Sequence, residues 1–89
     1  MPESVTLTIL FFAKARELVN CKESNLTVTS SERTVAQLQL EILAQFPALD
    51  AIRDNFILAY NEEYRDDPHE IIRVTSGDEI AIIPPISGG

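Results

Sequence analysis

The chain has 89 residues and a formal net charge of −7, with 7 Lys and Arg against 14 Asp and Glu. A chain of this length forms one small domain with one hydrophobic core. The acidic balance argues against a nucleic-acid binder and against adsorption to an anionic membrane, and it favours a basic protein partner. Its one cysteine excludes an internal disulfide framework and a four-cysteine zinc site.

The N-terminal residues do not have the composition of a secretory signal. An apolar stretch at residues 9–12 precedes Ala13-Lys14-Ala15, which imitates a signal-peptidase site, but residues 1–4 carry no positive charge. The longest apolar run elsewhere, residues 80–86, is far shorter than the roughly 20 residues that span a bilayer. We therefore expect a cytosolic protein without membrane contact.

Residues 5–12 predict the first strand, because β-branched and aromatic residues alternate there. One face holds Val5, Leu7, Ile9 and Phe11, so Phe12 points outward from the other face. Residues 14–23 are expected to form a polar connection. A weaker alternation around residues 26–28 predicts a second strand, which pairs back on the first.

A helix is expected to begin at Thr34, because Thr34 and Gln37 have the spacing of a capping box. Pro47 ends it, since the residue before a proline avoids the helical region. The predicted apolar stripe consists of Val35, Leu38, Ile42 and Phe46, widened by Leu40 and Leu43.

Three further strands are predicted after the helix. Residues 56–60 form a continuous apolar run typical of a strand that is central or buried on both faces. Residues 62–70 contain five acids and predict a solvated loop, or else a contact for a basic partner. Residues 71–74 and 79–83 predict the last two strands, with a turn at 76–78. In the final strand Ile80 and Ile82 face one way, and Ala81 and Ile83 the other.

This order predicts an α+β fold, in which one main helix packs on a mixed sheet of four to five strands. The first and last strands are expected to be neighbours at the centre of the sheet. The predicted domain covers residues 1–85, and residues 86–89 form a flexible C-terminal tail.

The reactive groups do not assemble into a recognisable catalytic, metal or cofactor site. His69 lacks a second ligand at a metal-binding spacing, and Cys21 beside Lys22 is interpreted as a structural or surface thiol. The acidic run lacks the spacing of a calcium loop, and phosphate-binding motifs are missing. We therefore expect no bound metal or cofactor and no catalytic site of the chain's own.

The C-terminal segment is the exception. Pro84 and Pro85 stiffen the exit from the last strand, and the tail that follows is Ile86-Ser87-Gly88-Gly89. Four residues span at most about 13 to 14 Å when fully extended. Because the last two have no side chains, such a tail can thread a narrow channel. The alternative is a frayed terminus.

Three segments together resemble the family of small, sulfur-carrier subunits of molybdopterin synthase: LFFA at 10–13, REL at 16–18 and GDEIAIIPPISGG at 77–89. The resemblance spans the whole chain and implies a ubiquitin-like β-grasp fold. It also implies that an E1-like activating partner consumes ATP to adenylate the Gly89 carboxylate. Sulfur then replaces AMP, which gives a thiocarboxylate at Gly89. The sulfur passes to a cyclic pyranopterin monophosphate in complex with the large synthase subunit, in a heterotetramer.

The same resemblance implies a partner-binding surface formed by Phe12, Tyr64 and Ile83. Asn20 stands where many members have glycine, which Asn can replace because it tolerates positive φ. Residues 82–83 are Ile-Ile where bacterial members commonly have an aromatic pair. The alternatives are a ubiquitin-like protein modifier, a thiazole-pathway sulfur carrier, and an interaction module with a frayed end.

Overall fold

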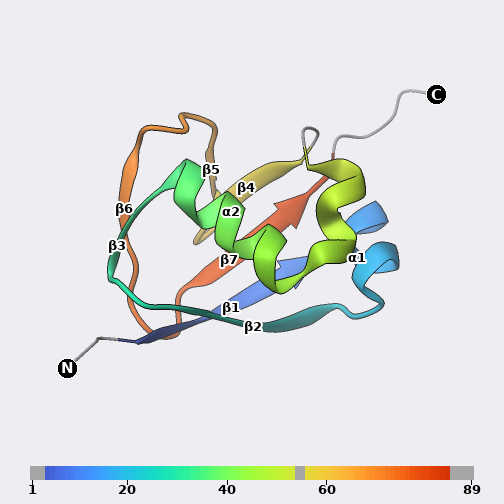
Figure 1. Cartoon of the computed structure of the whole chain (residues 1–89), viewed down its shortest axis with the longest axis horizontal. Coiled ribbons are helices and arrows are strands. Elements are labelled where there is room, and N and C mark those ends of the chain that lie inside the picture. The colour runs from blue at the N-terminus through green and yellow to red at the C-terminus, as the bar shows by residue number, and fades with distance from the viewer. Residues whose placement is uncertain (1–3, 54–55, 85–89) are drawn as a thin grey trace.

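The computed structural model describes residues 4–53 and 56–84, and Figure 1 shows the arrangement of its elements. The predicted tail at residues 86–89 lies outside the described residues. None of the described helices is both long enough and apolar enough to cross a bilayer. In chain order the elements are β1 (Val5–Phe11), α1 (Ala13–Val19), β2 (Glu23–Val28), β3 (Glu32–Thr34), α2 (Val35–Gln45), the 3-10 helix η1 (Pro47–Ile52), β4 (Ile57–Tyr60), β5 (Glu63–Arg65), β6 (Ile71–Arg73) and β7 (Glu79–Ile83).

The main sheet has five strands in the order β2-β1-β7-β4-β5, and β3 pairs with β6 in a separate two-stranded sheet. Strands β1 and β7 run parallel, whereas the other three pairings of the main sheet are antiparallel. The first and last strands are therefore neighbours in the interior of the sheet, as predicted. The α+β class with a mixed sheet and one main helix is confirmed.

Helix α2 covers one face of the main sheet (Figure 1). It begins at the predicted capping box, in which Thr34 Oγ1 accepts from the Gln37 N–H at 3.1 Å and Gln37 Oε1 accepts from the Thr34 N–H at 2.8 Å. At its other end the Phe46 ring packs edge-on against Phe11, with ring centroids 5.0 Å apart. The residues buried between α2 and the sheet include Val35, Leu38, Ile42, Leu7, Ile9, Leu58, Ile80 and Ile82.

The prediction for Leu40 was wrong, because this side chain is 61% exposed, whereas Leu43 packs against the core. Leu40 lies between the buried positions 38 and 42 in sequence, and a helix turns such an intermediate residue toward solvent.

The predicted polar connection at residues 14–23 was also wrong. Residues 13–19 form α1, which buries Ala15 in the core. The helix ends at Asn20, whose φ of 62° places it in the left-handed conformation that asparagine tolerates. Cys21 follows, is half-buried and packs against the core, which fits the structural interpretation of this thiol.

The acidic segment at residues 62–70 is only partly a loop, because residues 63–65 form β5 at the edge of the sheet. The Arg65 guanidinium forms ion pairs with Glu63 at 3.0 Å and with Glu70 at 2.8 Å. Strand β4 is an inner strand, as predicted, and lies between β7 and β5. It is not buried along its whole length, since Ile57 is 41% exposed.

Candidate functional site

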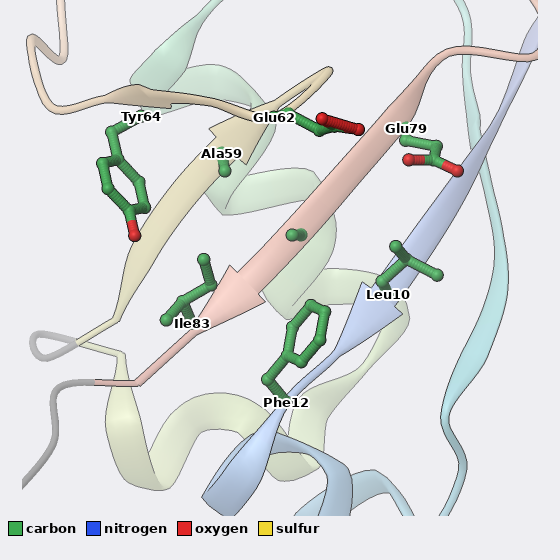
Figure 2. Close-up of a pocket in the computed structure, with 8 residues that line it drawn as sticks. Leu10, Phe12, Ala59, Glu62, Tyr64, Glu79 and Ile83 are labelled. Atoms are coloured by element: carbon green, nitrogen blue, oxygen red, sulfur yellow. The ribbon is translucent and has the colours of Figure 1, made fainter.

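A hollow of about 390 Å³ lies on the face of the main sheet that α2 does not cover. Figure 2 shows side chains from β1, β4, β5 and β7 around it. The lining residues alternate along the strands with the core residues, so that Leu10 and Ala81 face the hollow while Ile9 and Ile80 face α2. The hollow, called the sheet pocket below, is lined by Leu10, Phe12, Ala59, Glu62, Tyr64, Glu79, Ala81 and Ile83.

The register of the strands explains why the surface is hollow at this point. Leu10 pairs with Ala81, Ala81 pairs with Ala59, and Ala59 pairs with Tyr64, which gives one row across four strands. The two central members of this row have only a methyl side chain, while the outer two are large. The alanines therefore form the floor of the sheet pocket, and Leu10 and Tyr64 form opposite walls (Figure 2).

The next row toward the C-terminal end of β7 is apolar and exposed. Ile83 pairs with Ile57 on β4, and on its other side the Phe12 N–H donates to the Ile82 carbonyl at 3.2 Å. Phe12 is 42% exposed, Ile57 41% and Tyr64 69%. An exposed apolar cluster of this kind on a small domain is typical of an interaction surface.

The opposite end of the sheet pocket carries the two carboxylates of Glu62 and Glu79 (Figure 2). Glu62 follows Asn61 in the tight turn between β4 and β5, and both have positive φ, 48° for Asn61 and 73° for Glu62. The turn is fixed to β7 because the Asn61 N–H donates to the Glu79 carbonyl at 2.9 Å and Asn61 Oδ1 accepts from the Glu79 N–H at 2.9 Å. These contacts hold together the two backbone segments from which the Glu62 and Glu79 side chains extend.

A hydrogen-bonded group behind this turn stabilises it further. The Tyr60 hydroxyl donates to the Asp78 carboxylate, which also accepts from the Thr75 N–H at 2.8 Å. Burial and this hydrogen bond raise the pKa of Tyr60 to about 12. Burial pushes the pKa of Asp78 upward, but the hydrogen bonds from Tyr60, Thr75 and Asn61 outweigh it and hold the pKa below its ordinary value. Both shifts favour the neutral phenol and the charged carboxylate.

The structure brings together the three residues that sequence analysis assigned to a partner surface. Phe12 directly follows β1, Tyr64 lies in β5 and Ile83 ends β7, and all three line the sheet pocket. The alternation of residues along the first and last strands had already predicted that Phe12 and Ile83 face outward. Their role in binding stays a prediction.

Sequence analysis did not assign Ala59, Ala81, Glu62 and Glu79 to the site, nor Ile57 beside it. The alternation along the last strand placed Ala81 and Ile83 on one face, and this pattern could have identified Ala81 as part of the floor of the sheet pocket. The positions of Ile57 and Glu62 depend on the pairing of β4 with β5 and β7, which the sequence does not encode locally.

The other predicted site residues lie elsewhere. Ile86, Ser87, Gly88 and Gly89 are outside the described residues. His69 is exposed, and its N–H donates to Asp67 Oδ1 at 3.0 Å. Over residues 4–53 and 56–84, no group of three or more His, Cys, Asp or Glu side chains is placed to hold a metal ion.

Solved structures with the same arrangement of elements define the fold. The crystal structure of SAMP1 from Haloferax volcanii matches with a TM-score of 0.74 at 23% identity, covering 94% of this chain and 99% of that chain. A complex of subunits 1 and 2 of the molybdopterin-converting factor from Helicobacter pylori matches with a TM-score of 0.61 at 22% identity, covering 96% and 100%. At these identities the likeness shows the fold, which is the predicted ubiquitin-like β-grasp.

Sequence comparison then gives the family. The model of the ThiS family matches residues 9–89, and the chain belongs to this family. A curated relative from Drosophila yakuba is 49% identical over 85 residues, which cover 96% of this chain and 92% of the relative. That relative is named molybdopterin synthase sulfur carrier subunit. The resemblance found in the sequence motifs is therefore confirmed.

Proposed function

We propose that the chain is the sulfur carrier subunit of a molybdopterin synthase. The observation that carries this proposal is the 49% identity, over 96% of the chain, to a relative with that name. The sheet pocket supports it, because a carrier must dock on the enzyme that loads it and on the enzyme that it supplies. The likeness to SAMP1, at 23% identity, shows only a shared fold.

The proposed chemistry takes place at the carboxylate of Gly89. A carboxylate is a poor electrophile, so an E1-like enzyme first transfers AMP from ATP to it and releases pyrophosphate. A sulfur nucleophile then attacks the acyl carbon, AMP leaves, and Gly89 becomes a thiocarboxylate. In the synthase the thiocarboxylate sulfur bonds to a cyclic pyranopterin monophosphate. Water then attacks the acyl carbon and the carbon–sulfur bond breaks, so that the sulfur stays on the pterin and Gly89 returns to the carboxylate form. Two carriers in a heterotetramer would supply the two sulfurs of one dithiolene.

In this proposal the folded domain provides binding energy and position, and the large subunit provides the catalytic groups. The exposed apolar row formed by Phe12, Ile83 and Ile57 borders the end of β7, from which Pro84 and residues 85–89 continue. Docking through this row would therefore fix the origin of the reacting segment. We also propose a cytosolic location, since one cysteine requires no oxidising compartment.

Intact mass spectrometry tests the function. The purified chain is incubated with the E1-like enzyme, ATP and a sulfur donor, with reactions lacking ATP as the control. We expect a mass increase equal to the exchange of one oxygen for one sulfur, and loss of that increase after addition of the large subunit and the pterin. Recovery of the chain from cells mainly in isopeptide linkage to other proteins would instead identify a protein modifier.

A further inference from the structure

Glu62 and Glu79 are the two acids that line the sheet pocket. Within the described residues, neither carboxylate forms an ion pair, whereas Glu63 and Glu70, in and after β5, both pair with Arg65. The remaining ion pairs also use other acids: Arg33 with Glu41, Arg53 with Asp50, and Arg73 with Glu32. Both carboxylates of the sheet pocket are therefore available for an ion pair with a group outside the chain.

The backbone at Glu62 adds a second observation. Its φ of 73° lies in the left-handed region, at the turn position where glycine is favoured. A non-glycine residue is strained there. The chain thus carries a charged side chain at a position where local stability favours glycine.

We propose that Glu62 and Glu79 bind an arginine or lysine side chain of the protein that docks in the sheet pocket. The inference rests on the proposed function, so that protein is the large synthase subunit. Its docking segment carries an apolar group for the row at Phe12 and Ile83 and a basic group for the opposite end. Residues 79 and 83 are separated by four strand positions, so the two groups lie about 13 Å apart.

Charge complementarity favours this occupant over a second copy of the chain. The chain has a net charge of −7, and a second copy would bring further acids to a pocket that already holds two carboxylates. A basic segment of a partner removes their repulsion and gains charge-assisted hydrogen bonds, which are stronger where docking excludes water.

The test is a titration of the full-length chain with the purified large subunit. The double variant Glu62→Gln, Glu79→Gln removes both charges but keeps side-chain size. A control with the same change in net charge, Glu17→Gln with Asp66→Asn, alters residues outside the sheet pocket. We expect the double variant to bind about tenfold more weakly at low salt, mainly through slower association, and the difference to shrink at high salt. The control should bind like the wild type.

Glu62→Gly separates binding from folding. Glycine relieves the positive φ, so this variant should be at least as resistant to thermal unfolding as the wild type, yet it should bind the large subunit more weakly. Equal affinity of the wild type and the double variant, or equal losses in the double variant and the control, would overturn the inference while leaving the carrier function intact. Self-association of the wild type through these carboxylates would also overturn it. If the wild type neither accepts sulfur nor binds the large subunit, the proposed function itself fails.

Discussion

Ala59 and Ala81 lie opposite each other where β4 pairs with β7, and their methyl groups form the floor of the sheet pocket. A large residue at either position would fill the hollow between Leu10 and Tyr64. The pairing of two small residues in the middle of the sheet therefore creates a recess in a face that would otherwise be flat.

Replacing the floor should affect docking more than folding. In Ala81→Leu the added side chain enters the hollow, so we expect affinity for the large subunit to fall by about ten- to a hundredfold, or roughly 1.4 to 2.7 kcal/mol. The free energy of unfolding should change by less than about 1 kcal/mol, because Ala81 faces outward. Calorimetric titration and thermal unfolding measure the two effects. Ala44→Leu, on the exposed face of α2, is the matched control. Unchanged affinity in Ala81→Leu would contradict the role of the sheet pocket in docking.

The apolar walls should contain the residues that dominate binding. We expect Phe12→Ala, Tyr64→Ala and Ile83→Ala each to weaken assembly with the large subunit by about 1 to 4 kcal/mol, since large side chains at the centre of an interface carry most of its energy. Stability should fall less, because Phe12 and Tyr64 are exposed. Ile71→Ala, at an exposed apolar residue on β6 outside the sheet pocket, should leave affinity unchanged. Equal effects at Ile71 and at the three pocket residues would rule out a localised surface.

Sulfur transfer should require Gly88 and Gly89, whereas folding should not require them. Deleting both residues should abolish thiocarboxylate formation and leave the melting temperature unchanged, because neither has a side chain to pack. One extra residue after Gly89 should have the same effect, since it moves the reacting carboxylate away from the activating site. Intact mass and thermal unfolding report the two properties. A deletion that melts markedly earlier would assign the tail a structural role.

Asp78 should make stability depend on pH in the acid range. Its folded-state pKa lies below the ordinary value of 3.8, so its contribution is fully present above that pH and is lost as the pH falls through the folded-state pKa. Denaturant unfolding across this range should therefore show a smaller acid loss in Asp78→Asn than in the wild type. Asp66→Asn is the control for the removal of one charge. Parallel acid profiles for the wild type and Asp78→Asn would show that the hydrogen bonds to Asp78 have no net effect.

Tyr60 should make stability depend on pH in the alkaline range, where stability should fall as the pH rises. Its pKa is raised from 10.0 to about 12, so the contribution of the phenol is fully present below pH 10.0 and is lost as the pH rises toward 12. Tyr60→Phe should cost about 0.5 to 1.5 kcal/mol at neutral pH through the lost hydrogen bond. It should also flatten the alkaline decrease in stability. Tyrosinate absorbance in Tyr64→Phe, which retains only Tyr60, follows the ionisation directly. Equal alkaline losses in the wild type and Tyr60→Phe would contradict this role.

The elements that sequence analysis found are those whose signals lie within a few neighbouring residues. The capping box at Thr34 and Gln37 and the alternation in residues 5–12 depend on local geometry, and both are confirmed. Helix α1 was missed because its N-cap, Phe12, makes no side-chain cap hydrogen bond. The good helix formers in residues 13–18 were a signal that could have found it. Strand β5 was missed because its acidic composition resembles a loop, whereas its pairing with β4 decides its structure.

The same distinction applies to the candidate site. Phe12 and Ile83 were found by strand alternation and by the family motifs, but the row from Leu10 to Tyr64 exists only through the register of three strand pairings. Register depends on contacts between residues that are distant in sequence, so a pattern of neighbouring residues does not reveal it. The acidic end of the sheet pocket was overlooked for this reason.

The central position of β7 has a consequence for the synthesis of the protein. This strand comes last among the described elements, yet it joins β1 to β4, so the nascent chain cannot close its sheet until residue 83 has left the ribosome. Until then β1 and β4 each expose an edge to which another chain could add. Residues 84–89 follow β7 directly in the sequence. A chain that ends before β7 therefore lacks both the complete docking face and the segment that follows it. Such a chain would not bind the enzyme that loads complete carriers with sulfur.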